Sequence, residues 1–200
     1  ISACEKGQQW PWALGLLAEM PLRAVLPSII SYNAAASACA RHGRWREAGG
    51  LLATARSRAL RPDAITHNAT ISACEKGLRW EWALALLAAM PRHKLEPEVI
   101  CFNAAVSACE KCGHWAWALH LLAEMPRQTV HPDDVTYGAA ASACGRGLCA
   151  DRAISLLTHM RAGRLTPSEV THGAVIGALG MRLLWDEVLV LFDAMQQAGL

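Results

Sequence analysis

Cysteine is the residue type in this chain whose spacing most directly raises the question of a redox or metal site. Five of the eight cysteines recur at intervals of 35 residues: Cys4, Cys39, Cys74, Cys109 and Cys144. Disulfide frameworks crowd cysteines into short chains, whereas one cysteine per long period indicates a structural position that each period refills. Cys109 and Cys112 have the spacing of metal ligands, but no second pair accompanies them. We therefore predict free cysteines that serve as small core residues in a reducing compartment.

Histidines and carboxylates offer no arrangement typical of a catalytic or metal site. His67 and His172 occupy a position that is Tyr or Phe in the other periods, so we expect both to be packed in the core. The other six histidines form no cluster with ligand spacing, and no acid–base pair of carboxylates recurs. Walker-type glycine loops are also missing from the sequence. We expect no enzymatic activity, no cofactor and no small-molecule substrate.

The 35-residue interval organises the whole chain. Proline recurs at residues 27, 62, 97, 132 and 167, and position 1 of each repeat follows two residues later. The full repeats are 29–63, 64–98, 99–133 and 134–168, with partial repeats at 1–28 and 169–200. Periods of this size are typical of stacked repeats. We predict a single array over residues 1–200 and expect it to be an excerpt from a longer one.

Each repeat is predicted to form two helices. Asp or Ser before position 1 can cap the first helix, and glycine ends it at Gly7, Gly43, Gly77 and Gly113. The second helix carries apolar residues at steps of three and four, and Pro21, Pro91 and Pro126 are expected to end it early. The composition is 53% hydrophobic with a net charge of +2, which excludes a disordered chain. No apolar run reaches the roughly 18 residues of a membrane span, so we expect no membrane partner.

One stripe of the first helix carries side chains suited to nucleic acid. Positions 2, 5, 9 and 13, which share a helix face, hold an aliphatic residue, Asn, Ser and a cation in most repeats. The position-13 cations, which we predict to contact phosphates, are Lys6, Arg41, Lys76, Lys111 and Arg146. The helix dipole also explains cations near a helix end, but it does not explain three Asn at one interior position. Cations suit phosphates, aliphatic side chains suit the faces of bases, and amides suit base edges.

These features resemble the pentatricopeptide repeat family across essentially the whole chain. The resemblance rests on Tyr32-Asn33 and Phe102-Asn103, on the Leu-Leu-x-x-Met segments, and on Pro62-Asp63 and Pro132-Asp133. It implies an all-α fold, a right-handed α-solenoid (superhelix) of stacked helix-turn-helix repeats. It also implies sequence-selective binding of single-stranded RNA, one base per repeat, in the processing, stability or translation of transcripts in mitochondria or plastids.

The resemblance assigns base reading to position 5 together with the last residue of the same repeat. The matching pairs are Asn33 with Asp63, Asn68 with Glu98, and Asn103 with Asp133. The two Asn–Asp pairs look uracil-preferring, and Glu98 is longer by one methylene, so the RNA is expected to lean toward uridine and other pyrimidines. The position-2 residues, expected to pack against bases, are Ile30, Ile65, Ile100 and Val135. Gly138 with Ser168, and Gly173, lack a side-chain donor at position 5.

Departures from the family pattern leave two further hypotheses open. Trp10, Trp80 and Trp115, each followed two residues later by a second tryptophan (Trp12, Trp82 and Trp117), are predicted to pack between repeats. Gly49-Gly50 interrupts one second helix and predicts local softness. One alternative function is a protein–protein interaction scaffold, with protein partners in place of RNA. The other is a structural array that has lost its ligand.

Overall fold

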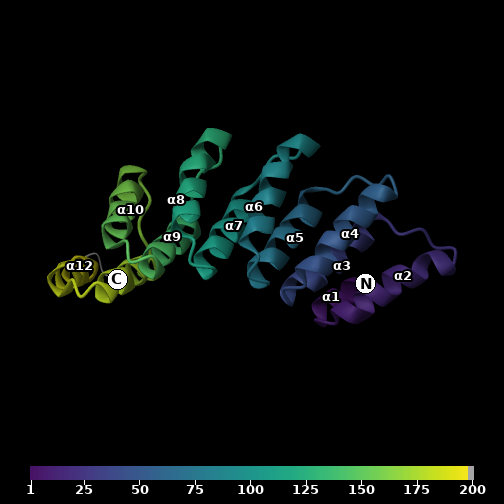
Figure 1. The fold of residues 1–200 in the computed structure, drawn as a ribbon, viewed down its shortest axis with the longest axis horizontal. Coiled ribbons are helices and arrows are strands. Elements are labelled where there is room, and N and C mark those ends of the chain that lie inside the picture. The colour runs from purple at the N-terminus through teal and green to yellow at the C-terminus, as the bar shows by residue number, and fades with distance from the viewer. Residues whose placement is uncertain (198–200) are drawn as a thin grey trace. The chain divides into compact units, whose positions relative to one another are not determined.

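The computed structural model describes residues 1–197, and every regular element in that range is a helix. The first helices of the repeats are α1 (Ser2–Lys6), α3 (Ile29–Arg41), α5 (Ala64–Lys76), α7 (Val99–Lys111), α9 (Asp134–Arg146) and α11 (Glu169–Met181). The second helices are α2 (Trp10–Leu22), α4 (Trp45–Ser57), α6 (Trp80–Ala89), α8 (Trp115–Glu124), α10 (Ala150–Ala162) and α12 (Trp185–Gln197). Short 3₁₀ turns, η1 (Pro91–His93) and η2 (Met125–Gln128), follow α6 and α8 (Figure 1). The prediction of an all-α chain of helical hairpins is confirmed.

The chain divides into two compact units, Ile1–Ala108 and Cys109–Leu200. In the first unit α1, α3 and α5 form one layer, and α2, α4 and α6 pack against them (Figure 1). In the second unit α9 and α11 lie side by side, and α8, α10 and α12 pack against this pair. Each unit therefore stacks helical hairpins as the repeat pattern predicts. None of the helices within residues 1–197 has the length and apolarity needed to cross a membrane.

Small side chains fill the space between the first helices. Ala35 and Ala36 of α3 are fully buried, and so is Cys39 one turn later. Cys4 of the first, partial repeat is only partly buried, whereas Cys74 and Cys144 occupy the same buried position as Cys39, which confirms a core role for these three cysteines. Burial raises the pKa of these three thiols to about 11, so they stay protonated and unreactive at neutral pH.

The turn inside each repeat contains a residue in the left-handed conformation. Gly43 and Gly113 adopt it with φ of +64° and +77°, and Leu78 adopts it at the same repeat position with φ of +55°. Gly7 and Gly77 end α1 and α5 directly, one residue before this left-handed position. The predicted glycines therefore serve two adjacent roles, and only the later one requires a left-handed backbone.

Proline sets the length of some second helices. Both α6 and α8 have ten residues and end before Pro91 and Pro126, whereas α4 and α10 lack this proline and have thirteen residues. The prediction is wrong for Pro21, which lies inside α2 one residue before its end. A proline in the last turn removes one helical hydrogen bond but keeps a helical φ, so the helix can pass through it.

Candidate nucleic-acid interface

The aliphatic residue at position 2 is solvent-exposed in every repeat. The exposed fractions are 71% for Ile30, 58% for Ile65, 64% for Ile100, 62% for Val135 and 76% for Val170. A single exposed aliphatic residue needs no explanation, but the same exposure in five successive repeats does. Stiff, β-branched side chains held at the start of each first helix can pack against flat ligand groups. The predicted position-2 residues are therefore accessible for contact with bases.

Asn33 and Asp63, the predicted pair of repeat 29–63, are in direct contact. The Asn33 amide nitrogen Nδ2 donates to both carboxylate oxygens of Asp63, at 3.1 and 2.9 Å. Thr66 completes the network, because its hydroxyl donates to Asn33 Oδ1 at 2.5 Å and its backbone N–H donates to Asp63 Oδ1 at 3.0 Å. The Asn33 side chain therefore has one orientation, with its oxygen toward Thr66 and its nitrogen toward Asp63.

The orientation of Asn33 leaves one amide hydrogen for a ligand. Two oxygens of one carboxylate subtend a much smaller angle at Nδ2 than the two N–H bonds do, so one hydrogen serves both oxygens. Asn33 is only 9% exposed, whereas Asp63 is half-buried at the start of α5. The pair thus holds an amide beside a carboxylate, with Ile30 and Ile65 as exposed neighbours in sequence.

Hydrogen bonding keeps Asp63 ionised. Burial acts to raise the pKa of Asp63, but the bonds from the Thr66 backbone N–H and the Asn33 amide outweigh it, so the pKa lies below its usual value of 3.8. The same carboxylate caps the first turn of α5, which fixes Asn33 and Asp63, the predicted base-reading pair (below, the reading pair), at the start of a helix.

The next predicted pair, Asn68 and Glu98, has a different arrangement. Cys101 takes the place of Thr66 here, and its thiol donates to Asn68 Oδ1 at 2.6 Å. Glu98 is exposed, and none of the hydrogen bonds described within residues 1–197 joins it to Asn68. The repeat therefore holds its Asn through a weaker donor and does not place the acidic side chain against it.

The two members of the third predicted pair, Asn103 and Asp133, belong to different units. Asn103 lies in α7 and is partly buried in the first unit. In the second unit Asp133 accepts from the Thr136 backbone N–H at 2.9 Å, as Asp63 does from that of Thr66, and it also accepts from the Thr136 hydroxyl at 2.8 Å. Asp133 and Thr136 form a complete capping box at the start of α9.

In repeat 134–168, a different residue supplies the missing polar group. Gly138 has no side chain, but Asp134, one turn earlier, accepts from the Ser168 hydroxyl at 2.5 Å and from the Thr171 hydroxyl at 2.7 Å. Burial again acts to raise the pKa of Asp134, and the bonds from Ser168 and Thr171 together lower it below 3.8. This repeat therefore presents a carboxylate without an amide.

The predicted phosphate contacts of position 13 are all exposed: Lys6, Arg41, Lys76, Lys111 and Arg146. Each lies at or near the end of a first helix, where a cation is also favoured by the helix dipole. Arg146 additionally forms an ion pair with Glu110 of the preceding repeat, with Nη2 3.2 Å from Oε1. The charge of Arg146 is therefore partly balanced by this carboxylate.

Position 3 was not among the predicted site positions, yet its side chains hold the predicted residues in place. It holds Thr66, Cys101, Thr136 and Thr171, and each of these residues bonds a polar group of the preceding repeat or of the intervening cap. The available signal was a hydroxyl or thiol that recurs every 35 residues, with Ser31 as its first member. Asp134 was not predicted either, because it lies at position 1, outside the stripe of positions 2, 5, 9 and 13.

The prediction of packing between repeats is correct for Trp10, Trp82 and Trp115, and it is wrong for Trp12, most of which is exposed. Arg44 of the next repeat lies 4.3 Å from the Trp10 ring, and the Trp115 ring packs so closely on Gly147 that an added Cβ would lie 2.2 Å from it. In contrast, 69% of Trp12 is exposed, as are 51% of Trp82 and 45% of Trp117. Trp82 nevertheless packs on the preceding repeat, where its ring lies 5.8 Å from the ring of Trp45.

Comparison with protein families matches most of the chain to pentatricopeptide repeats. A model described as a pentatricopeptide repeat domain matches residues 50–112 and 85–147, and a model described as a PPR repeat matches residues 30–56 and 170–200. Among the curated proteins that were compared, none matches the chain.

Solved structures with the same fold include two of the pentatricopeptide repeat protein PPR10. The crystal structure of PPR10 from maize is 30% identical to this chain and covers 98% of it, with a TM-score of 0.78. PPR10 in complex with an 18-nt psaJ RNA element is 29% identical, covers 100% of the chain and has a TM-score of 0.69. This chain spans only 28% of PPR10 in either structure. The PPR domain of Arabidopsis thaliana protein-only RNase P 1, in complex with tRNA, shares the fold at 18% identity, with a TM-score of 0.70 over 82% of this chain and 87% of that one.

Proposed function

Because this chain belongs to the pentatricopeptide repeat family, we propose that it binds single-stranded RNA along the first helices of its repeats, with one base assigned to each repeat. The observation that carries the proposal is the network of Asn33, Asp63 and Thr66 beside the exposed Ile30 and Ile65. An oriented amide and carboxylate next to exposed aliphatic side chains form a polar edge beside an apolar one. A base can use both, since its edge forms hydrogen bonds with polar groups and its faces pack against apolar side chains.

The order of donor and acceptor at Asn33 and Asp63 favours uracil. Uracil offers O4 as an acceptor for the free Asn33 N–H and N3–H as a donor to the Asp63 carboxylate. Cytosine and adenine place an amino group where Asn33 also donates, so both leave two donors facing each other. Guanine has the same order as uracil on a larger ring, and the family resemblance selects uracil between them. We extend the pyrimidine preference to Asn68 with Glu98 and to Asn103 with Asp133.

The test is a change of base preference. Fluorescence anisotropy with short single-stranded RNAs that differ at one base measures the preference of repeat 29–63. Asn33→Thr combined with Asp63→Asn is expected to shift that preference from uracil toward adenine, because the carboxylate acceptor becomes an amide. Each well-placed pair of polar contacts discriminates by about 1–3 kcal/mol, which corresponds to a factor of about 5 to 150. An unchanged preference contradicts the coding role of this pair.

The position-13 cations predict a dependence on salt. Each contacted phosphate lowers the slope of log K against log salt by about 0.7 for a single strand, so five contacts give about −3.5. Lys76→Ala should make the slope less steep by about 0.7, the value for one contact, without changing base preference. An affinity that stays constant as salt rises contradicts RNA binding through this row.

A protein-interaction scaffold is the second candidate, favoured by the exposed Trp12, Trp82 and Trp117. Tryptophan is common at protein interfaces, where it supplies a large contact area. A mutation distinguishes the two candidate functions, since Trp12→Ala would weaken binding of a protein partner and leave RNA affinity unchanged.

We also propose that the protein acts by occupancy, through the processing, stability or translation of transcripts in mitochondria or plastids. This assignment rests on the family resemblance, and microscopy of the fluorescently tagged full-length gene product tests it. A nuclear or cytosolic signal contradicts it.

A further inference from the structure

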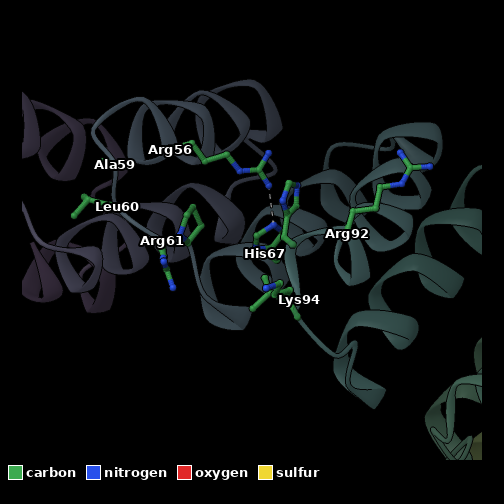
Figure 2. A pocket seen from close by; sticks show the side chains of 10 residues that line it. Arg56, Ala59, Leu60, Arg61, His67, Arg92 and Lys94 are labelled. Carbon is green, nitrogen blue, oxygen red and sulfur yellow. Dashed lines mark hydrogen bonds between the residues drawn. The ribbon is translucent and has the colours of Figure 1, made fainter.

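A basic cavity lies beside the reading pair of repeat 29–63 and takes no part in the proposed base contacts. Its volume is about 660 Å³, and Figure 2 shows the side chains that line it. The titratable residues among them are Arg56, Arg61, His67, Arg92, His93 and Lys94. No carboxylate side chain lines the cavity, although the whole chain has nearly as many acidic as basic residues.

His67 and Arg56 form the polar wall of this cavity. Arg56 Nη2 lies 3.1 Å from His67 Nε2, and His67 Nδ1 lies 2.9 Å from the backbone oxygen of Asp63 (Figure 2). Both contacts are satisfied when neutral His67 donates from Nδ1 and accepts at Nε2. The His93 ring lies 6.0 Å from the His67 ring. The same Asp63 thus offers its carboxylate to Asn33 on one side and its carbonyl to the cavity wall on the other.

Comparison of the repeats shows that Arg56 and His67 replace two other residue types together. Where position 4 is Tyr32, Phe102 or Tyr137, the residue eleven positions earlier is Pro21, Pro91 or Pro126.

Where position 4 is histidine, the residue eleven positions earlier is arginine, in the pairs Arg56–His67 and Arg161–His172. An aromatic residue with proline is therefore exchanged for histidine with arginine as a unit. Arg161 lines a hollow with Asp186 and Glu187, whereas the cavity at Arg56 has no acidic lining residue.

The positive charges of the cavity are not neutralised by the protein. Within residues 1–197 none of the described ion pairs involves Arg56, Arg61, Arg92 or Lys94. Burial lowers the pKa of His67, and the nearby charges of Arg56 and His93 lower it further. Like charges gathered in a concave surface without counter-charge attract an anion.

We propose that this cavity binds a phosphate group. Arg56 and His67 form its inner wall, and Lys94 lies on the opposite side of His67 from Arg56 (Figure 2). Arg61 lines the same space, while the Arg92 guanidinium points away from His67 and lies at the rim (Figure 2). The site is distinct from the position-13 cations, because its residues come from the end of α4, the start of α5, η1 and the loops that follow α4 and η1, whereas position 13 lies at the other end of α5. Guanidinium and ammonium groups bind phosphate through charge-assisted hydrogen bonds.

The test measures binding of inorganic phosphate and pyrophosphate by isothermal titration calorimetry, at ionic strength matched with chloride. The test variant is the double substitution Arg61→Ala with Lys94→Ala. Lys94 has a left-handed φ of +59°, and Ala59 occupies the same repeat position with φ of +57°, so alanine is accommodated there. Both side chains are exposed, so their loss should leave the fold intact. Phosphate should bind the double variant at least about tenfold more weakly, since hydrogen bonds to charged groups contribute about 1.5–3 kcal/mol.

The matched control is Arg58→Ala with Arg164→Ala. Both residues are exposed, the loss of charge is equal, and neither residue lines the cavity. Arg164 also has the repeat position and the left-handed backbone of Lys94. The control should bind phosphate like the parent protein. Equal weakening in the two double variants, or no phosphate binding by the parent protein, overturns the proposal.

The phosphate group could belong to the RNA backbone or to a free phosphate compound, and a competition experiment distinguishes these two sources. This experiment is the only part of the test that rests on the proposed function. If the natural occupant is an RNA backbone phosphate, inorganic phosphate weakens binding of a uridine-rich strand to the parent protein but not to Arg61→Ala with Lys94→Ala. If the occupant is a free phosphate compound, RNA and phosphate bind independently. Both outcomes support a phosphate site and identify its occupant.

Discussion

Thr66 provides the sharpest test of how the reading pair is held. Its side chain is fully buried, and its hydroxyl donates to Asn33 Oδ1 across the boundary between two repeats. Thr66→Val keeps the shape and β-branching of the side chain but removes the donor. Asn33 Oδ1, on a side chain that is only 9% exposed, then loses its hydrogen-bond donor.

The expected loss of stability comes from Asn33 Oδ1, the acceptor that loses its hydrogen bond. A buried acceptor without a donor destabilises a protein by about 1–3 kcal/mol. The Asp63 carboxylate keeps two of its donors, the Thr66 backbone N–H and the Asn33 amide, so it adds little. We therefore expect Thr66→Val to lower the free energy of unfolding by about 1–2 kcal/mol, measured by urea denaturation.

Thr70→Val is the matched control. Thr70 is also buried in α5, and its hydroxyl donates at 2.8 Å to the backbone oxygen of Thr66, which is already an acceptor in the helical ladder. Its loss leaves no acceptor without a donor and should cost less than about 0.5 kcal/mol. A cost for Thr66→Val that is no greater than that for Thr70→Val would refute the role assigned to the Thr66 hydroxyl.

Three further predictions concern the turns and the cap. Gly77→Ala should destabilise the protein by about 1–3 kcal/mol in thermal unfolding, because its Cβ would lie 2.6 Å from the Trp45 ring, whereas Gly50→Ala, with open space around it, should stabilise it by about 1 kcal/mol. Leu78→Gly should stabilise by up to about 1 kcal/mol, since φ of +55° strains leucine, and a variant less stable than the parent would contradict this explanation. The pKa of Asp63 is lowered by folding, so its contribution to stability is present above pH 3.8 and is lost as pH falls through the lowered value. Acid titration followed by circular dichroism should therefore show a shallower acid destabilisation for Asp63→Asn than for the parent protein.

The sequence alone determined the repeat unit and most of what lies inside it. A 35-residue period with apolar residues at helical spacing has one physical solution, a pair of helices that buries its apolar faces against the next pair. For that reason the buried Cys39 and Cys74 and the packed His67 were predictable. Pro21 was not, because a proline near a helix end can be accommodated or can end the helix.

Only the tertiary structure decided which side chains meet across repeats. The donor to Asn33 is Thr66, 33 residues away, and the carboxylate beside Ser168 comes from Asp134, 34 residues away. Periodicity places such residues at equivalent positions, but a hydrogen bond depends on distances of a few tenths of an ångström and on side-chain direction. The pairing of Arg56 with His67 is a further case, since the spacing was visible in the sequence and its chemical meaning depended on the cavity that the stacked helices enclose.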